Sequence, residues 1–330
     1  MKKIFYFIFL FSILLLTGCQ KYNEKSIKND LINKYGNLSG YYIDGYLEIY
    51  NGDNTYKYDV ETSHYDTNYK VKLVNKNNNH EQIILRNDDG VYVLTPALNK
   101  TFKFQSNWPE NTSQIYLIES FINDINQDDK IKLIDKKNTY IIEAKIAYSN
   151  NKNLVKEKIY FDKDLSLKKI EIYDDDSNIQ MKFEINSIDL KSSFNDAYFG
   201  VEDNMKGKNV ETKETMNELE ETIYPMYLPS GTYLSSEENV SKEEGDRVIL
   251  SFSGESPFIL VQETVSVNEE DDIIPVSGEP EFILDTLGAV SGSSINFISN
   301  GIEYYLSSDS LTKEEMMQVA ESISPVAVMK

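Results

Sequence analysis

The chain has 330 residues and a formal charge of −21, from 33 Lys and Arg against 54 Asp and Glu, with one cysteine and two histidines. A single cysteine cannot form an internal disulfide, and two histidines without ligand spacing leave little for a zinc site or a Ser–His–Asp relay. An acidic chain also lacks the basic surface that nucleic acid needs. What remains is a globular protein, long enough for two domains.

The N-terminus has the order of a secretory signal. A basic start at residues 1–3 precedes an apolar run at 4–16, and the small residues Thr17 and Gly18 then precede Cys19. The apolar run is too short for an ordinary membrane span, which needs roughly 17–25 residues. The segment is therefore predicted to be a signal peptide.

Residues 16–19 resemble the cleavage site of bacterial lipoprotein signals. The resemblance implies that residues 1–18 are removed and that Cys19 carries a thioether-linked diacylglycerol, whose acyl chains hold the protein on a membrane. No cofactor is expected apart from this covalent diacylglycerol on Cys19. Membrane lipid, bound through Cys19, is the first predicted partner, and the predicted location is the extracytoplasmic face of the cell membrane. The alternatives are a cleaved secretory signal with an incidental cysteine and an uncleaved short anchor.

Residues 19–200 predict one curved antiparallel sheet with two helices. Apolar residues at a helical period indicate a first helix at 26–35 and a second, with a broad apolar face, at 113–125. Elsewhere the period becomes two, as where Tyr56, Tyr58 and Val60 alternate with charged residues. The predicted strands lie at 41–50, 55–62, 69–74, 82–86, 91–95, 101–104, 130–134, 139–148, 155–161 and 167–173, with a further one around 181–185.

This order predicts a mainly β (α+β) fold, in which helices cover the concave side of an incomplete antiparallel barrel. Such a sheet encloses an apolar interior with a mouth, where a ligand or partner can bind. The candidate binding residues belong to the second helix and its entrance: Trp108, Ile115, Leu117, Ile118, Phe121 and Ile122. Packing in the core is the competing interpretation for each of them. His64 and His80 fall near strand ends and are expected at the surface.

A resemblance to a known family lies in the hairpin 90–104, with the sequence GVYVLTPALNKTFKF, in Trp108 and Pro109, and in the helix 115–125. These segments resemble the LolA-like lipoproteins of endospore-forming bacteria, often described as sporulation or germination lipoproteins. The resemblance implies the half-barrel fold of the carriers LolA and LolB and of the first domain of RseB, a periplasmic regulator of an anti-sigma factor. LolA is a soluble shuttle, whereas Cys19 predicts a tethered protein, so a shuttle is the weaker hypothesis.

Negative charge is concentrated in the last part of the chain. Residues 201–330 hold 26 acidic and 7 basic side chains, a net charge of −19, whereas the rest of the chain has a net charge of −2. Residues 201–222 are predicted to form a linker with a short helix, and 223–330 a small acidic α+β domain. Thr312 and Glu315 predict a capping box at the start of its last helix. Its predicted strands lie at 248–252, 258–265, 295–299 and 302–307.

The end of this domain resembles a small module found in envelope proteins and sigma-factor regulators of spore formers. The predicted function is binding without catalysis, since the sequence shows no nucleophile elbow and singles out no carboxylate pair. We expect an anchored extracytoplasmic scaffold, chaperone or cofactor for an envelope or membrane protein, in sporulation, germination or cell-wall remodelling. No catalytic residue, no metal site and no nucleic-acid partner are expected, while the acidic domain is suited to a basic partner.

Two alternatives use the same fold. One is a carrier that holds acyl chains in the half-barrel, and the other is an RseB-like sensor that regulates a signalling partner in the membrane. The scaffold and the carrier differ in what fills the concave face. A carrier predicts a dry cavity under a movable helix, whereas a scaffold predicts that the apolar face of the second helix closes the cavity permanently.

Overall fold

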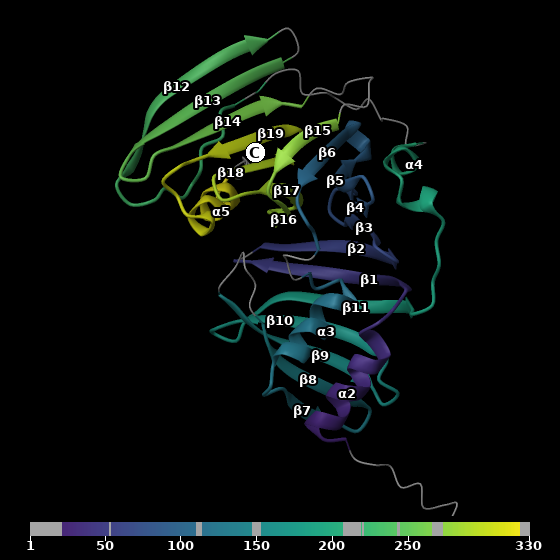
Figure 1. Cartoon of the computed structure of the whole chain (residues 1–330). Coiled ribbons are helices and arrows are strands. Elements are labelled where there is room, and N and C mark those ends of the chain that lie inside the picture. The colour runs from purple at the N-terminus through teal and green to yellow at the C-terminus, as the bar shows by residue number, and fades with distance from the viewer. Residues whose placement is uncertain are drawn as a thin grey trace, which may run out of the picture.

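The computed structural model describes residues 22–52, 54–109, 114–146, 153–206, 219, 221–242, 245–265 and 273–323. These residues form two β-sheets and a small number of helices (Figure 1). The predicted mainly β fold class is confirmed. The larger sheet is the predicted incomplete barrel, and the smaller sheet with its helix is the predicted C-terminal α+β unit.

The larger sheet has twelve strands among the described residues, in the order β15-β6-β5-β4-β3-β2-β1-β11-β10-β9-β8-β7. Neighbouring strands are antiparallel, except that β15 joins β6 in parallel. Because β11 returns to pair with β1, the two ends of the meander lie side by side in the middle of the sheet. The strands are β1 (Gly40–Asn51), β2 (Asn54–Tyr65), β3 (Asn68–Asn75), β4 (Glu81–Asn87), β5 (Gly90–Thr95), β6 (Lys100–Gln105), β7 (Lys132–Asp135), β8 (Thr139–Lys145), β9 (Leu154–Asp162), β10 (Leu167–Asp174), β11 (Ile179–Asp189) and β15 (Ile273–Ser277).

The larger sheet has a β-bulge in β11 at Asn186, the one extra residue that faces the step from Asp44 to Gly45 in β1. A bulge increases the local twist of a strand and so curves the sheet. A Cβ on residue 45 would lie 2.6 Å from the ring of Phe183, which is fully buried. Glycine at this position therefore lets the ring of Phe183 pack directly on the backbone at the bend.

Two helices lie on the concave face of the larger sheet (Figure 1). α2 (Glu24–Tyr35) begins with a capping box between Asn23 and Ser26, close to the predicted start. α3 (Ile118–Gln127) begins later than the predicted start at residue 113. The backbone is still extended at Leu117, with φ −107° and ψ 135°, so the residues before it enter the core as an irregular segment.

The smaller sheet has seven strands among the described residues, in the order β12-β13-β14-β19-β18-β17-β16. α5 (Lys313–Glu321) packs on one face, and Thr312 and Glu315 form the predicted capping box. The four predicted strands correspond to β13, β14, β18 and β19, whereas β12, β15, β16 and β17 are additional. The strands of this sheet are β12 (Thr232–Lys242), β13 (Gly245–Gly254), β14 (Phe258–Thr264), β16 (Glu279–Ile283), β17 (Thr286–Val290), β18 (Ser294–Ser299) and β19 (Ile302–Ser307).

Three short helical segments complete the described fold: η2 (Pro96–Leu98), η3 (Asp196–Phe199) and α4 (Val201–Met205). Val201 and Met205 of α4 pack on the convex face of β4 and β5. The predicted domain limits, 1–18, 19–200, 201–222 and 223–330, stay predictions. One strand does not follow these limits: β15 lies in the predicted C-terminal domain, between β14 and β16, and yet belongs to the larger sheet.

Candidate functional site

The six candidate binding residues come together on the concave face of the larger sheet. They lie in α3 and in the segment that leads into it, and each is between 0% and 6% exposed within the main hydrophobic core. Ile118, Phe121 and Ile122 recur at helical spacing, so one face of α3 points toward the sheet. The residues that complete the set are Trp108, Ile115 and Leu117. The structure places all six in a packed interior, and their role in binding stays a prediction.

Trp108 lies at the entrance to α3 and is fully buried. Its ring meets the ring of Tyr69 edge to face, with the ring centroids 5.9 Å apart. Arg86 Nη1 donates a hydrogen bond to the carbonyl oxygen of Trp108 at 2.9 Å. The indole Nε1 has no hydrogen-bond partner among the described residues. These contacts hold Trp108 against β3 and β4.

A buried polar group lies at the first turn of α3. Tyr41 donates a hydrogen bond from its hydroxyl to Glu119 Oε2 at 2.7 Å, and His64 Nε2 lies 3.8 Å from Glu119 Oε1. The ring of His64 stacks on Tyr69, with centroids 4.4 Å apart. Burial and the Glu119 carboxylate raise the pKa of Tyr41 well above its ordinary value, so this hydroxyl stays a hydrogen-bond donor. The group ties α3 to β1 and β2.

The expectation that His64 lies at the surface is wrong, because the residue is 4% exposed. β2 continues beyond the predicted end at residue 62, and its alternation turns His64 toward the concave face. The signal was present in the sequence: the period of two that includes Tyr58 and Val60 continues through Thr62 to His64.

A pair of carboxyl groups lies between α3 and β9. Glu157 on β9 is 3% exposed, and its Oε1 has no hydrogen-bond partner in the described structure. Burial and the charge of Asp124 raise the pKa of Glu157 well above its ordinary value, and burial raises the pKa of Asp124 on α3 to about 7. Sequence reasoning missed this pair, although Glu157 precedes Ile159 and Phe161 at the period of a buried strand face.

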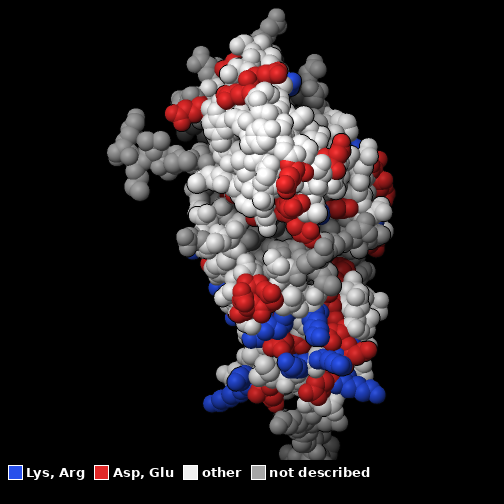
Figure 2. Space-filling model, turned by 90° about the vertical axis from the view of Figure 1, so that its left-hand side faces the viewer, with Lys and Arg blue, Asp and Glu red and all other residues white. Residues whose placement is uncertain are grey.

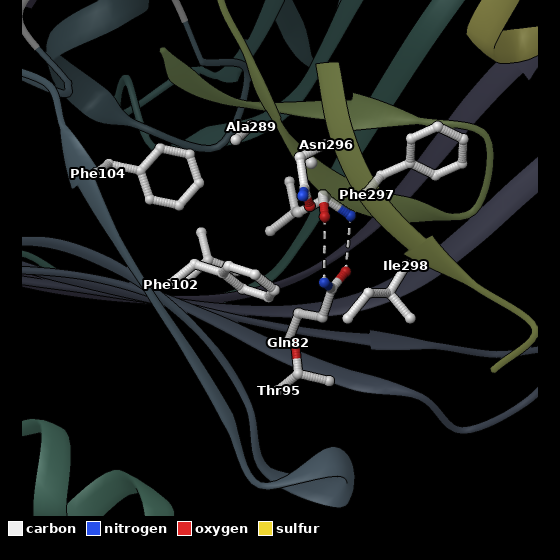
Figure 3. Close-up of a pocket in the computed structure, with 11 residues that line it drawn as sticks. Gln82, Thr95, Phe102, Phe104, Ala289, Asn296, Phe297 and Ile298 are labelled. Carbon is white, nitrogen blue, oxygen red and sulfur yellow. Dashed lines mark hydrogen bonds between the residues drawn. The ribbon is translucent and has the colours of Figure 1, made fainter. Parts of the chain in front are cut away.

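The smaller sheet fills the other half of the concave face. Leu287, Ala289 and Ile298 belong to the same hydrophobic core as Phe102 and Phe104 of β6. Figure 3 shows the two rings of β6 on one side of a pocket and the strands of the smaller sheet on the other. The pocket has a volume of about 10 Å³, which is room for a single water molecule. It is far too small for an acyl chain.

Gln82 of β4 joins the two sheets at this pocket. Its Nε2 donates a hydrogen bond to the carbonyl oxygen of Leu287 at 3.3 Å, and the Leu287 amide donates to Gln82 Oε1 at 2.7 Å, as the dashed lines in Figure 3 show. Thr286 Oγ1 donates to the same oxygen at 3.1 Å. The buried amide is therefore satisfied by the backbone of β17, as a polar group inside a core must be.

Polar contacts surround this joint. Lys100 Nζ and Glu303 Oε2 form an ion pair at 3.1 Å, and Asn75 Nδ2 donates a hydrogen bond to the carbonyl oxygen of Asp285 at 3.2 Å. Burial lowers the pKa of His80, which lies half-buried near Asp285. The smaller sheet is thus held to the larger one by a shared core and by contacts around its rim.

Cys19 lies outside the described residues. Within the described part of the chain, no helix has both the length and the apolar character needed to cross a membrane.

The open larger sheet, with helices on its concave face, matches the half-barrel expected from the sequence. The chain belongs to the family of sporulation protein YdcC of Bacillus subtilis (strain 168), to which it is 34% identical over 318 residues, 95% of this chain and 94% of that relative. This confirms the predicted closeness to sporulation proteins. No protein-family model matches the sequence.

Two solved structures share features of the fold. A crystal structure of MucB matches with a TM-score of 0.36 and 10% identity, covering 91% of this chain and 98% of MucB. A LolA superfamily protein from Nitrosomonas europaea matches with a TM-score of 0.30 and 9% identity, covering 55% of this chain and 99% of that protein.

Proposed function

We propose that the chain is a lipid-anchored extracytoplasmic protein that binds an envelope protein during sporulation, without enzymatic activity of its own. Membership of the YdcC family supports the link to sporulation. The observation that carries the binding role is the concave face, whose core is shared with α2, α3 and the smaller sheet. A protein with a filled interior offers its partner an outer surface, as a scaffold, chaperone or cofactor does.

The alternative is a carrier of acyl chains, which needs open apolar volume inside the half-barrel. Here the six candidate residues are buried among their neighbours, and the pocket beside Gln82 holds about 10 Å³. An acyl chain would reach these residues only after α3 or the smaller sheet moved away. The polar group of Tyr41, His64 and Glu119 also holds α3 in place, which favours the scaffold.

Native mass spectrometry of residues 20–330, purified without detergent, tests the two hypotheses. We expect the mass of the protein alone, because the described residues on the concave face pack against one another in a single core. The control is the same sample after organic delipidation, which should leave both the mass and the folded charge-state distribution unchanged. A non-covalent lipid at one copy per chain, lost on delipidation, would establish the carrier instead.

Replacing Cys19 with Ala tests the anchor. Two acyl chains hold a protein on a membrane far more firmly than one, so their loss should move the protein from the membrane fraction to the soluble fraction. Fractionation and immunoblotting measure the shift, with Ser12→Ala as a control inside the same apolar run. If the Cys19→Ala protein stayed in the membrane fraction, an uncleaved segment or a partner would hold it there.

A further inference from the structure

The smaller sheet ends in an exposed strand. β12 is at one edge of the sheet, and among the described residues it pairs with β13 alone. Every side chain from Tyr233 to Ser241 is exposed. Edge strands of this length are usually protected by proline, by lysines or by a bulge. β12 has no proline, its one lysine is at its last position, and its bulge lies near its start, between Leu234 and Ser236. Beyond the bulge, the outer side of β12 pairs with no other described strand and can take a further one.

One face of the sheet beside β12 is open and carries apolar side chains among polar ones, which include Glu238 and the Arg247–Glu263 ion pair. Ile249, Val261 and Tyr305 are aligned across β13, β14 and β19 by the strand register, on the face opposite α5. Large side chains on this face are exposed to between 40% and 60%: Tyr233, Val240, Ile259 and Tyr305. The same face continues into the joint with the larger sheet at Asn296, beside the pocket of Figure 3. Exposed apolar groups that gather in this way mark an interaction surface.

The negative charge around β12 favours a basic partner. Glu237 and Glu238 lie at the middle of the strand, and the part of the chain from residue 201 onward carries a net charge of −19. Figure 2 shows mostly acidic and uncharged side chains over the upper part of the molecule, where the smaller sheet lies, and Lys and Arg mixed with Asp and Glu over the lower part. Glu237 accepts hydrogen bonds from Tyr224 at 2.7 Å and from Thr222 at 3.1 Å, which hold its charge at the edge.

We propose that β12 is a docking edge, to which an extended basic segment of the envelope partner adds as a further strand of the smaller sheet. Main-chain hydrogen bonds between the partner segment and β12 supply affinity. The open face of the sheet contacts every second side chain of that segment, and Glu237 and Glu238 favour lysine and arginine in it. A second copy of this chain fits less well, because pairing two β12 strands brings like charges together. This inference rests on the proposed function and specifies the chemistry of its partner.

A defined peptide tests the edge directly. The probe is a peptide of about eight residues in which Lys and Val alternate, a length typical of one strand, and its control replaces every Lys with Glu. With the full-length chain in detergent, we expect the basic peptide to bind, to slow hydrogen exchange in β12, and to weaken about ten-fold or more between about 0.05 and 0.5 M salt. Equal binding of both peptides, or binding without protection of β12, would overturn the proposal.

Two substitutions localise the effect. The double change Tyr233→Lys and Val240→Lys places lysines at exposed positions of β12 and repels a basic strand, so the affinity for the basic peptide should fall about ten-fold or more. The matched control is Ile179→Lys, an exposed isoleucine at the start of β11 in the larger sheet. If the control weakened binding as much as the double variant, the peptide would bind by overall charge and the docking edge would be wrong.

Cross-linking in sporulating cells separates this proposal from the proposed function. The inference is supported if the wild-type chain and the Ile179→Lys chain cross-link to the same envelope protein while the β12 double variant does not. If all three capture that protein, the function stands and the docking edge is wrong. If the wild type captures only a second copy of itself, or no protein, the basic-partner proposal fails, and in the latter case the binding function fails with it.

Discussion

Replacing Phe121 with Ala is expected to lower the free energy of unfolding by about 3–5 kcal/mol, the range for large aromatic side chains in cores. Phe121 is 1% exposed, and its ring meets Tyr35 of α2 and Phe161 of β9 at centroid distances of 5.6 and 6.2 Å. Truncation leaves a cavity where both helices meet the sheet. Denaturant unfolding of residues 20–330 and of the variant measures the difference.

The matched control is Asn123→Ala, on the exposed side of α3, where a change of less than about 0.5 kcal/mol is expected. Comparing the two positions separates packing from helix propensity. A loss below about 1 kcal/mol at Phe121, accompanied by uptake of a fluorescent fatty acid, would mean that α3 is only loosely packed. That result would favour the carrier over the scaffold.

Replacing Glu157 with Gln is expected to stabilise the protein above neutral pH and to flatten its dependence on pH. The pKa of Glu157 is raised well above its unfolded value, about 4.3, and that of Asp124 is raised to about 7. The folded state therefore binds protons that the unfolded state releases. The contribution of this pair to wild-type stability should be greatest near pH 4 and fall as the pH rises through 7, by about 1.4 kcal/mol for each unit of raised pKa.

Urea unfolding at a series of pH values between about 4 and 9 measures this dependence. Glu143→Gln on β8 is the control with the opposite sign, because Lys132 Nζ donates to Glu143 Oε1 at 2.9 Å and lowers the pKa of that carboxyl. Its removal should cost a little stability above its pKa and leave the slope near neutral pH unchanged. Wild-type stability that stays constant from pH 5 to 8 would show that the buried pair is not protonated as inferred.

The sequence patterns predicted the half-barrel well because its strands have one buried face. The alternation at Tyr58 and Val60 and the helical spacing of Ile118, Phe121 and Ile122 each reflect a single buried side. The patterns did not predict strands that lack one buried and one exposed face. β12 exposes every side chain from Tyr233 to Ser241, and β17 buries all five of its residues, so neither strand alternates.

The joint between the sheets was not predictable for another reason. Gln82 appears in the sequence as a polar residue at the start of a strand, and its partners, Thr286 and Leu287, are about two hundred positions away. The parallel pairing of β15 with β6 is equally distant along the chain. Local periodicity holds no information about such contacts, so the packing of the smaller sheet into the half-barrel emerged only from the structure.

β15 ties the smaller sheet to the larger one through the backbone. The chain leaves the smaller sheet after β14, adds one strand to the larger sheet, and returns as β16, so sliding one sheet over the other must first break the β15–β6 ladder. In Figure 1, α2 lies at the lower end of the molecule and β12 at the upper end. Two residues separate Cys19 from Tyr22, a reach of about 10 Å. If Cys19 carries the proposed lipid anchor, we expect the α2 end to face the membrane and β12 to lie at the far end of the molecule, which would set the height above the bilayer at which the proposed partner binds.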